Sequence, residues 1–142
     1  MNAVVLGKLL IDELSSSATV TTAYLTALCD VDNIQISKMD ICMYSHWAEA
    51  EFIGLKNGIL VQSADVLSMD NHLMVMGCGS NEYEMIDKGE SFNDFEVIVG
   101  YSGISKSLTG TDFNNRVDES CVAGWLLLEL AGLPLPTLED VK

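Results

Sequence analysis

The chain has 142 residues, of which 49% are hydrophobic and 20% are charged, a composition typical of one folded globular domain. Its 21 Asp and Glu residues against seven Lys and Arg give a net charge of −14, which argues against nucleic acid and anionic membrane surfaces as partners. The same charge opposes binding of a polyphosphate, which needs local positive charge or a metal ion. Solubility is the simplest explanation of the acidity.

The cysteines and the missing leader indicate a cytoplasmic protein. No CxxC spacing occurs, so no structural zinc site is expected. Apolar neighbours predict that the cysteines are buried free thiols in a reducing compartment. The chain starts without a basic leader, and no apolar run approaches the ~20 residues that span a bilayer. The four cysteines are Cys29, Cys42, Cys78 and Cys121.

The first apolar stretches predict a strand and then a helix. Residues 1–11 are mostly apolar and are expected to form a strand. Three serines, Ser15, Ser16 and Ser17, then precede a second apolar stretch. This stretch predicts a buried helix over residues 18–29, because small hydroxyl side chains favour the start of a helix, where they cap free N–H groups.

Two more helices are predicted in the middle of the chain. Ser37 with Asp40 three residues later has the pattern of a capping box and predicts a helix over residues 37–54. A turn containing glycine separates it from a short helix over residues 59–67. Apolar spacing predicts that the buried face of the longer helix consists of Ile41, Tyr44, Ser45, Ala48 and Phe52.

The C-terminal half predicts strands followed by a helix. Strands are expected over residues 72–76 and 83–86, and a third over residues 95–101, which are rich in β-branched side chains. A helical pattern covers residues 111–130. The order of three helices, strands and a helix is typical of an α+β layer architecture. The side chains expected in the core from the last helix are Trp125, Leu126, Leu127 and Leu128.

Three motifs, taken in order, resemble the galactokinase branch of the GHMP small-molecule kinases. Residues 14–18 read LSSSA, as in the phosphate-binding loop of that family. Residues 48–54 and 57–62 read AEAEFIG and NGILVQ, and they resemble the family's AExxFxG…CGIMDQ stretch. Residues 97–119 are similar to its strand, HSL-like turn and YxxRRxxC helix. Together the motifs extend over about residues 7–125.

The resemblance implies a partial GHMP kinase fold of the α+β class. Residues 1–78 would form the end of an N-terminal lobe (ribosomal S5 domain 2-like) with the phosphate-loop helix and the magnesium segment. Residues 79–142 would begin the C-terminal antiparallel-sheet lobe. Nothing in the chain resembles the family's N-terminal sugar-binding segment or its C-terminal glycine-rich motif. We therefore expect an internal fragment or a degenerate copy of such a kinase.

The resemblance also implies ATP and Mg²⁺ as cofactors and a monosaccharide, phosphorylated at its anomeric hydroxyl, as substrate. Galactose is the default sugar, with galacturonate and arabinose as neighbours. In such a site, N–H groups at a helix start hold phosphate oxygens, while a serine hydroxyl and a carboxylate hold the metal ion. The implied residues are Ser15, Ser16, Ser17 and Ala18 for ATP, and Ser16 with Glu49 for Mg²⁺.

Two departures from the family pattern predict impaired chemistry. Val61 occupies the position of the aspartate that takes or orients the proton of the sugar hydroxyl, and loss of a positioned base typically costs about 10²–10⁴-fold in rate. Asp65 lies one helical turn further on, too far to replace that base. Asp12 and Glu13 stand where the family has glycines, and their charges would repel a triphosphate.

Two other candidate residues receive structural interpretations. Arg116, which survives from the third motif, is expected to form an ion pair on a helix surface with Asp112 or Glu119. His46, next to a tryptophan in a predicted helix, is expected to pack against its neighbours and not to catalyse.

Three functions remain open from the sequence. The first is ATP-dependent sugar phosphorylation, impaired in this chain. The second is a non-catalytic remnant that binds a sugar or a partner protein, and the third is a fragment without function. Sugar and nucleotide are the expected ligands wherever binding survives, and exposed apolar surface favours self-association.

Overall fold

The computed structural model describes residue 4, residues 16–77, 79–89 and 95–100, residue 103 and residues 110–137. The chain divides into two units, Met1–Ser107 and Leu108–Lys142. Of the strand predicted over residues 1–11 the structure describes residue 4 alone, and Asp12, Glu13 and Ser15 lie outside the described residues. The elements are α1 (Ser16–Val31), α2 (Lys38–Trp47), the π-helix η1 (Ala48–Ile53), α3 (Leu60–Leu67), β1 (His72–Met76), β2 (Tyr83–Asp87) and α4 (Phe113–Leu130).

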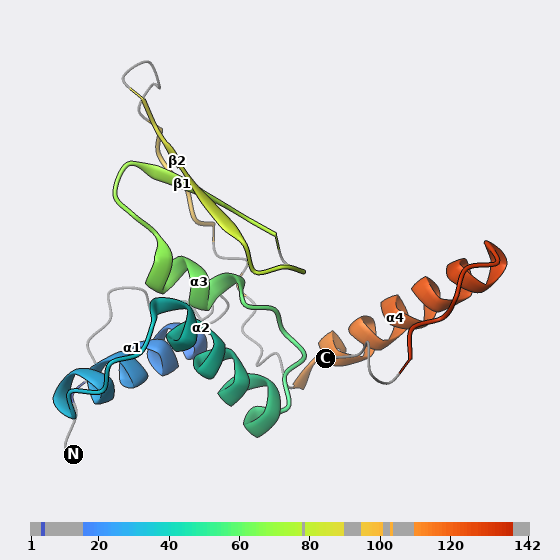
Figure 1. Cartoon of the computed structure of the whole chain (residues 1–142), viewed down its shortest axis with the longest axis horizontal. Coiled ribbons are helices and arrows are strands. Elements are labelled where there is room, and N and C mark those ends of the chain that lie inside the picture. The colour runs from blue at the N-terminus through green and yellow to red at the C-terminus, as the bar shows by residue number, and fades with distance from the viewer. Residues whose placement is uncertain are drawn as a thin grey trace. The chain divides into compact units, whose positions relative to one another are not determined.

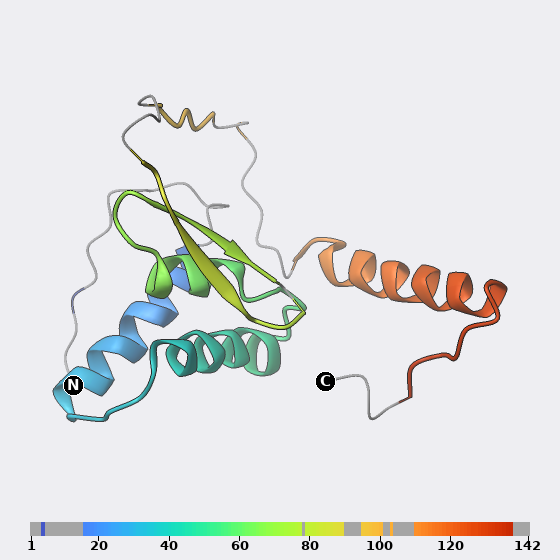
Figure 2. The same ribbon diagram turned by 45° about the horizontal axis from the view of Figure 1, so that its top comes forward.

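This order of elements is the α+β arrangement that the sequence predicts. In the first unit α1, α2 and α3 pack against one another, and β1 and β2 form an antiparallel hairpin beside them (Figures 1 and 2). The assignment of residues 1–78 and 79–142 to two kinase lobes stays a prediction. None of the described helices is long and apolar enough to cross a membrane.

Helix α1 buries one face only. Ala18, Thr22 and Cys29 are its buried residues, and most of its other side chains are exposed. The Thr22 hydroxyl donates to the carbonyl of Ala18 at 2.8 Å, so the polar atom on the buried face is satisfied within the helix. After the helix ends at Val31, Asn33 adopts a positive φ of 53°, a conformation that Asn tolerates better than most residues. The predicted helix is confirmed, but the prediction that it is buried is wrong for most of its side chains.

The capping box at the start of α2 is confirmed. The Ser37 hydroxyl accepts a hydrogen bond from the Asp40 N–H at 3.0 Å, and the Asp40 carboxylate accepts one from the Ser37 N–H at 3.2 Å. The predicted single helix over residues 37–54 is instead two elements, because α2 continues into η1. Both elements end before Gly54, whose φ of 78° suits glycine best.

The predicted buried face of this segment is partly wrong. Tyr44 is 57% exposed and Phe52 91% exposed. Ser45 is buried as predicted, and it shares the buried row with Cys42 and Glu49, which the prediction left out. Apolar spacing missed Glu49 because its side chain is charged, and the wider turn of a π-helix changes which residues of η1 face the core.

The hairpin packs on the helices through methionines. Met74 of β1 pairs with Met85 of β2, and both lie against the core cluster together with Met76. The alternate side chains of β1, Leu73 and Val75, are more than half exposed, as the period of two in a strand requires. The core cluster consists of Cys42, Ile59 and Leu67.

Two predictions in the C-terminal half are wrong. The described residues 95–100 form no strand, and Ile98 is 91% exposed, since β-branched residues form a strand only where a neighbouring strand pairs with them. Helix α4 forms as predicted, yet none of its residues, all of which the structure describes, is buried. Trp125 is 45% exposed and Leu127 67% exposed, so the predicted core positions are surface positions within this unit.

The prediction of buried cysteines is confirmed for two of them and wrong for one. Cys29 and Cys42 are buried free thiols, as predicted. Cys121 is exposed on α4, which contradicts the prediction, because an apolar neighbour in sequence does not bury a residue unless another element covers it. Cys78 lies outside the described residues.

Candidate functional site

The centre of the candidate site is the carboxylate of Glu49, which is 1% exposed. Glu49 lies in η1, and its backbone carbonyl accepts the Leu55 N–H at 3.2 Å as the chain leaves that element. Short π-helical segments occur frequently at functional sites, because the inserted residue redirects a side chain. A buried carboxylate is costly unless polar groups surround it. The neighbours of Glu49 therefore decide what this residue can do.

Three side chains donate hydrogen bonds to this carboxylate. The Ser17 hydroxyl of α1 donates to Oε1 at 2.9 Å. Asn57 Nδ2 donates to Oε2 at 2.8 Å, and Gln62 Nε2 of α3 donates to the same oxygen at 2.7 Å. The two oxygens of Glu49 thus differ, since two amides hold Oε2 and a single hydroxyl holds Oε1.

Further contacts fix the residues that donate to Glu49. His46 Nε2 lies 2.9 Å from the carbonyl oxygen of Asn57, and this contact ties the turn before α3 to α2. The Cys42 thiol contacts the carbonyl oxygen of Gln62 at 3.4 Å. Burial raises the pKa of this thiol, which therefore stays protonated at neutral pH. The predicted packing role of His46 stays a prediction, and the structure adds this contact with the carbonyl oxygen of Asn57.

Polar atoms without partners gather around the same place. Among the described residues, buried side-chain atoms that lack a hydrogen bond are Asn57 Oδ1, Gln62 Oε1, Ser45 Oγ and Ser63 Oγ. The two amide oxygens belong to the residues that donate to Glu49. Buried acceptors are normally satisfied, so unsatisfied ones invite explanation by a water molecule or an ion.

The described part of the serine motif lies next to Glu49. Ser16 is exposed at the start of α1, Ala18 is buried, and Ser17 contacts the carboxylate. The sequence paired Ser16 with Glu49, whereas the geometry brings Ser17 to it. The first turn of α1, which the structure describes in full, contains no acidic side chain. That turn therefore adds no negative charge of its own at the start of the helix, where the dipole favours anions.

Position 61 offers no titratable group. Val61 lies in α3 directly before Gln62, and its side chain is half-buried. Asp65, one turn further along α3, is exposed to solvent. Residues four apart share a helix face but lie about 6 Å apart along the axis, so Asp65 does not take the place of an acid at position 61.

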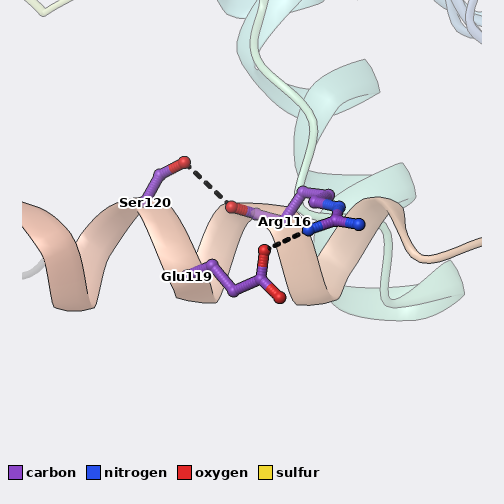
Figure 3. Close-up of polar contacts among 3 residues, drawn as sticks. All are labelled: Arg116, Glu119 and Ser120. Carbon is purple, nitrogen blue, oxygen red and sulfur yellow. Dashed lines mark hydrogen bonds and ion pairs between the residues drawn. The ribbon is translucent and has the colours of Figure 1, made fainter.

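Arg116 belongs to α4 in the second unit. Its guanidinium donates to the Glu119 carboxylate at 2.6 Å, and the Ser120 hydroxyl donates to its carbonyl oxygen at 2.9 Å (Figure 3). The two charged side chains are 71% and 62% exposed. The predicted ion pair on a helix surface is confirmed, with Glu119 as the partner.

The donor set around Glu49 suits a hard cation. Carboxylate and hydroxyl oxygens suit Mg²⁺, and the site contains both in Glu49 and Ser17, whereas the two amides face the carboxylate with their N–H groups and not with their oxygens. No group of three or more His, Cys, Asp or Glu side chains comes together in the described part of the chain. One carboxylate by itself suits a metal that keeps water or phosphate oxygens among its ligands, which is the usual behaviour of Mg²⁺.

Asn57 and Gln62 are the site residues to which the sequence assigned no role. Both stand inside the segment that resembles the family motif, at either end of NGILVQ. A buried glutamate eight residues before an asparagine gives no recognisable local spacing, because the contact forms only after η1 and the turn fold back. The one sequence feature that could have identified the two residues is their position inside the motif that resembles the kinase family.

Comparison with known proteins finds sugar kinases. The chain is 36% identical over 120 residues to a galacturonokinase of Arabidopsis thaliana, a match that includes 84% of this chain and 28% of that protein. It is 29% identical over 106 residues to a galactokinase of Limosilactobacillus reuteri, with 75% of this chain and 26% of the relative matched. A galactokinase of Thermococcus kodakarensis is 30% identical over 103 residues, a match that includes 72% of this chain and 29% of that protein.

The chain thus spans less than a third of the length of these relatives. No family model matches it. No solved structure matches it either. The similarities extend over most of this chain, which therefore resembles one part of a galactokinase or galacturonokinase.

Proposed function

We propose that this chain carries the magnesium side of a galactokinase-type site for ATP-dependent phosphorylation of a monosaccharide, and that phosphoryl transfer by the chain itself is impaired. The observation that supports the proposal most directly is the hydrogen bond between Ser17 and Glu49. It joins the two motif segments from which the resemblance expects the hydroxyl and the carboxylate of the metal site.

Glu49 and Ser17 would hold Mg²⁺, with Ser17 in the role that the resemblance assigns to Ser16. When bound, the ion offsets negative charge on the phosphates of ATP. The N–H groups at the start of α1 (Ser16–Val31) would hold a phosphate oxygen only against the repulsion expected from Asp12 and Glu13, which precede this helix in the sequence. These residues bind and orient, and none of them removes a proton from the sugar.

The impairment follows from Val61. An isopropyl group neither accepts a proton nor orients a hydroxyl, and Asp65 is exposed one turn away. We expect a rate at least about 10²-fold below that of a site with a positioned base. Galacturonate and galactose are the sugars to test, because the names of the relatives point to them.

A non-catalytic binding role is the second candidate. The absence of an acid at position 61 favours it, since binding does not require the base. In this case a sugar, a nucleotide or a partner protein would bind without turnover. Self-association through exposed apolar side chains stays a prediction as well, with Trp125 and Leu127 of α4 among those exposed.

The test is a turnover and binding assay on the full chain. The chain is incubated with ATP, MgCl₂ and either sugar, and ³¹P NMR follows formation of the sugar phosphate. We expect no product above background from the wild type or from Val61→Asp, and Mn²⁺ binding in the wild type that Glu49→Ala abolishes. Product from the wild type would overturn the impairment, and a wild type without Mn²⁺ binding would overturn the metal site.

A further inference from the structure

We propose that Asn57 and Gln62 are positioning residues that hold Oε2 of Glu49, so that Oε1 alone is left to bind a divalent cation beside the start of α1 (Ser16–Val31). This inference rests on the proposed function, because it takes Glu49 as the metal ligand. The observation that supports it is that Oε2 of Glu49 accepts two hydrogen bonds, whereas Oε1 accepts one.

The amide contacts are short and come from two places in the chain. Asn57 Nδ2 lies 2.8 Å and Gln62 Nε2 2.7 Å from Oε2. Asn57 stands in the turn after η1 (Ala48–Ile53), and Gln62 is in α3 with 0% of its surface exposed. Two N–H donors on one oxygen fill its outward lone-pair directions, because a carboxylate oxygen accepts about two such bonds.

The other oxygen meets a weaker restraint. Oε1 accepts one bond, from the Ser17 hydroxyl at 2.9 Å. A hydroxyl rotates, so its hydrogen can turn away and leave its oxygen as a second ligand beside Oε1. An amide N–H cannot do this, since its donor atom has no lone pair to offer. A cation therefore replaces the hydrogen of Ser17 more easily than those of Asn57 and Gln62.

Backbone contacts anchor the two residues, and repulsion between acceptors sets the orientation of their side-chain amides. The Asn57 backbone carbonyl lies 2.9 Å from His46 Nε2, and the Gln62 backbone carbonyl contacts the Cys42 thiol at 3.4 Å. Reversing either amide would place its oxygen against the Glu49 carboxylate, where two acceptors repel. The amide oxygens, Asn57 Oδ1 and Gln62 Oε1, have no hydrogen-bond partner among the described residues. They therefore do not contribute to the orientation of the amides.

The restraint on Oε2 of Glu49 also predicts which divalent cation the carboxylate prefers. A glutamate with both oxygens free can bind Ca²⁺ through both, whereas Mg²⁺ and Mn²⁺ in octahedral sites accept one oxygen from each carboxylate and keep waters. The arrangement therefore favours the smaller cation. Loss of a partner that orients a ligating carboxylate typically weakens metal binding about 10–100-fold.

The first measurement needs neither a variant nor a metal. In the ¹⁵N-labelled wild type, we expect the side-chain amide protons of Asn57 and Gln62 to exchange with solvent much more slowly than those of Gln35, which is exposed. Exchange as fast as that of Gln35 would show that the amides do not hold Glu49 and would overturn the inference.

The second measurement is metal binding by the full chain. MnCl₂ is titrated in the presence of ATP, and paramagnetic broadening gives the dissociation constant for the wild type, Gln62→Met and Asn57→Ala. We expect each variant to bind about 10-fold more weakly. The matched controls, Gln35→Met and Asn115→Ala, change exposed residues of the same types and should bind as the wild type does.

The third measurement is the infrared spectrum of the wild type with Mn²⁺. We expect the splitting of the carboxylate stretches that marks one bound oxygen, and a two-oxygen signature would overturn the inference even if both variants failed to fold. Equal dissociation constants in wild type and folded variants would overturn the positioning role alone. A wild type that binds no Mn²⁺ overturns the proposed metal site, and the inference with it.

Discussion

The hydroxyl of Ser17 lies 2.9 Å from Oε1 of Glu49, a contact between residues 32 positions apart. It joins the start of α1 to η1, and it is the point at which two separate motif segments become one site. Because Glu49 is 1% exposed, its hydrogen bonds matter to stability as well as to any ligand.

Replacement of Glu49 by alanine should destabilise the first unit by about 3 kcal/mol. The Ser17, Asn57 and Gln62 donors would lose their acceptor in a buried place, and water would not reach all of them. Urea denaturation followed by circular dichroism measures this change. The control is Glu51→Ala two residues away, where the exposed side chain should leave the midpoint nearly unchanged. An equal loss in both variants would contradict the buried network.

Replacement of Ser37 by alanine should cost about 1 kcal/mol, because the Asp40 N–H loses its acceptor at the start of α2. The conservative change Ser37→Thr retains a hydroxyl and should recover most of that stability. Thermal melts of the two variants and the wild type provide the comparison. A threonine variant as unstable as the alanine variant would argue that the cap contributes little.

Replacement of Gly54 by alanine should cost about 1 kcal/mol through the backbone alone. Gly54 has a φ of 78°, and an added Cβ would meet no atom within 4 Å, so steric crowding makes no contribution. Gly58→Ala is the matched control, since its surroundings are equally open and its φ is not positive. Similar midpoints for the two variants in urea would contradict this assignment.

Cys42 should make the first unit less stable at alkaline pH. Burial raises the pKa of its thiol in the folded state, so the unfolded chain releases this proton first as the pH rises. The contribution is present in full below the ordinary thiol pKa of about 8.5, and it is lost as the pH climbs from there through the raised pKa. Wild type and Cys42→Ala should therefore differ in the slope of unfolding free energy between about pH 8 and pH 10.

A thiol reagent gives an independent check of the same burial. Cys121 is exposed and should react with Ellman's reagent within the mixing time, whereas Cys42, with 0% of its surface exposed, should react only as fast as the fold opens. Cys121→Ser should lower the amplitude of the fast phase by one thiol. Rapid modification of Cys42 in the folded chain would contradict its burial.

The local elements were available from the sequence by itself. Ser37 and Asp40 start α2 through contacts three residues apart, and the burial of side chains in β1 alternates with the period of a strand. The motif segments also identified Glu49 and the serines as candidates. Such features depend on neighbours within one or two turns, so propensity and capping determine them without knowledge of the rest of the chain.

Tertiary structure decided which side chains are buried and which meet. Residues 95–100 form no strand despite their composition, because a strand needs a partner, and Trp125 remains exposed because burial needs a covering element. Ser17, and not Ser16, reaches Glu49, since the rotation of α1 against η1 sets which serine faces inward. The sequence determined where a carboxylate and serines stand along the chain, and only the packing of α1, η1 and α3 brought them within hydrogen-bond distance.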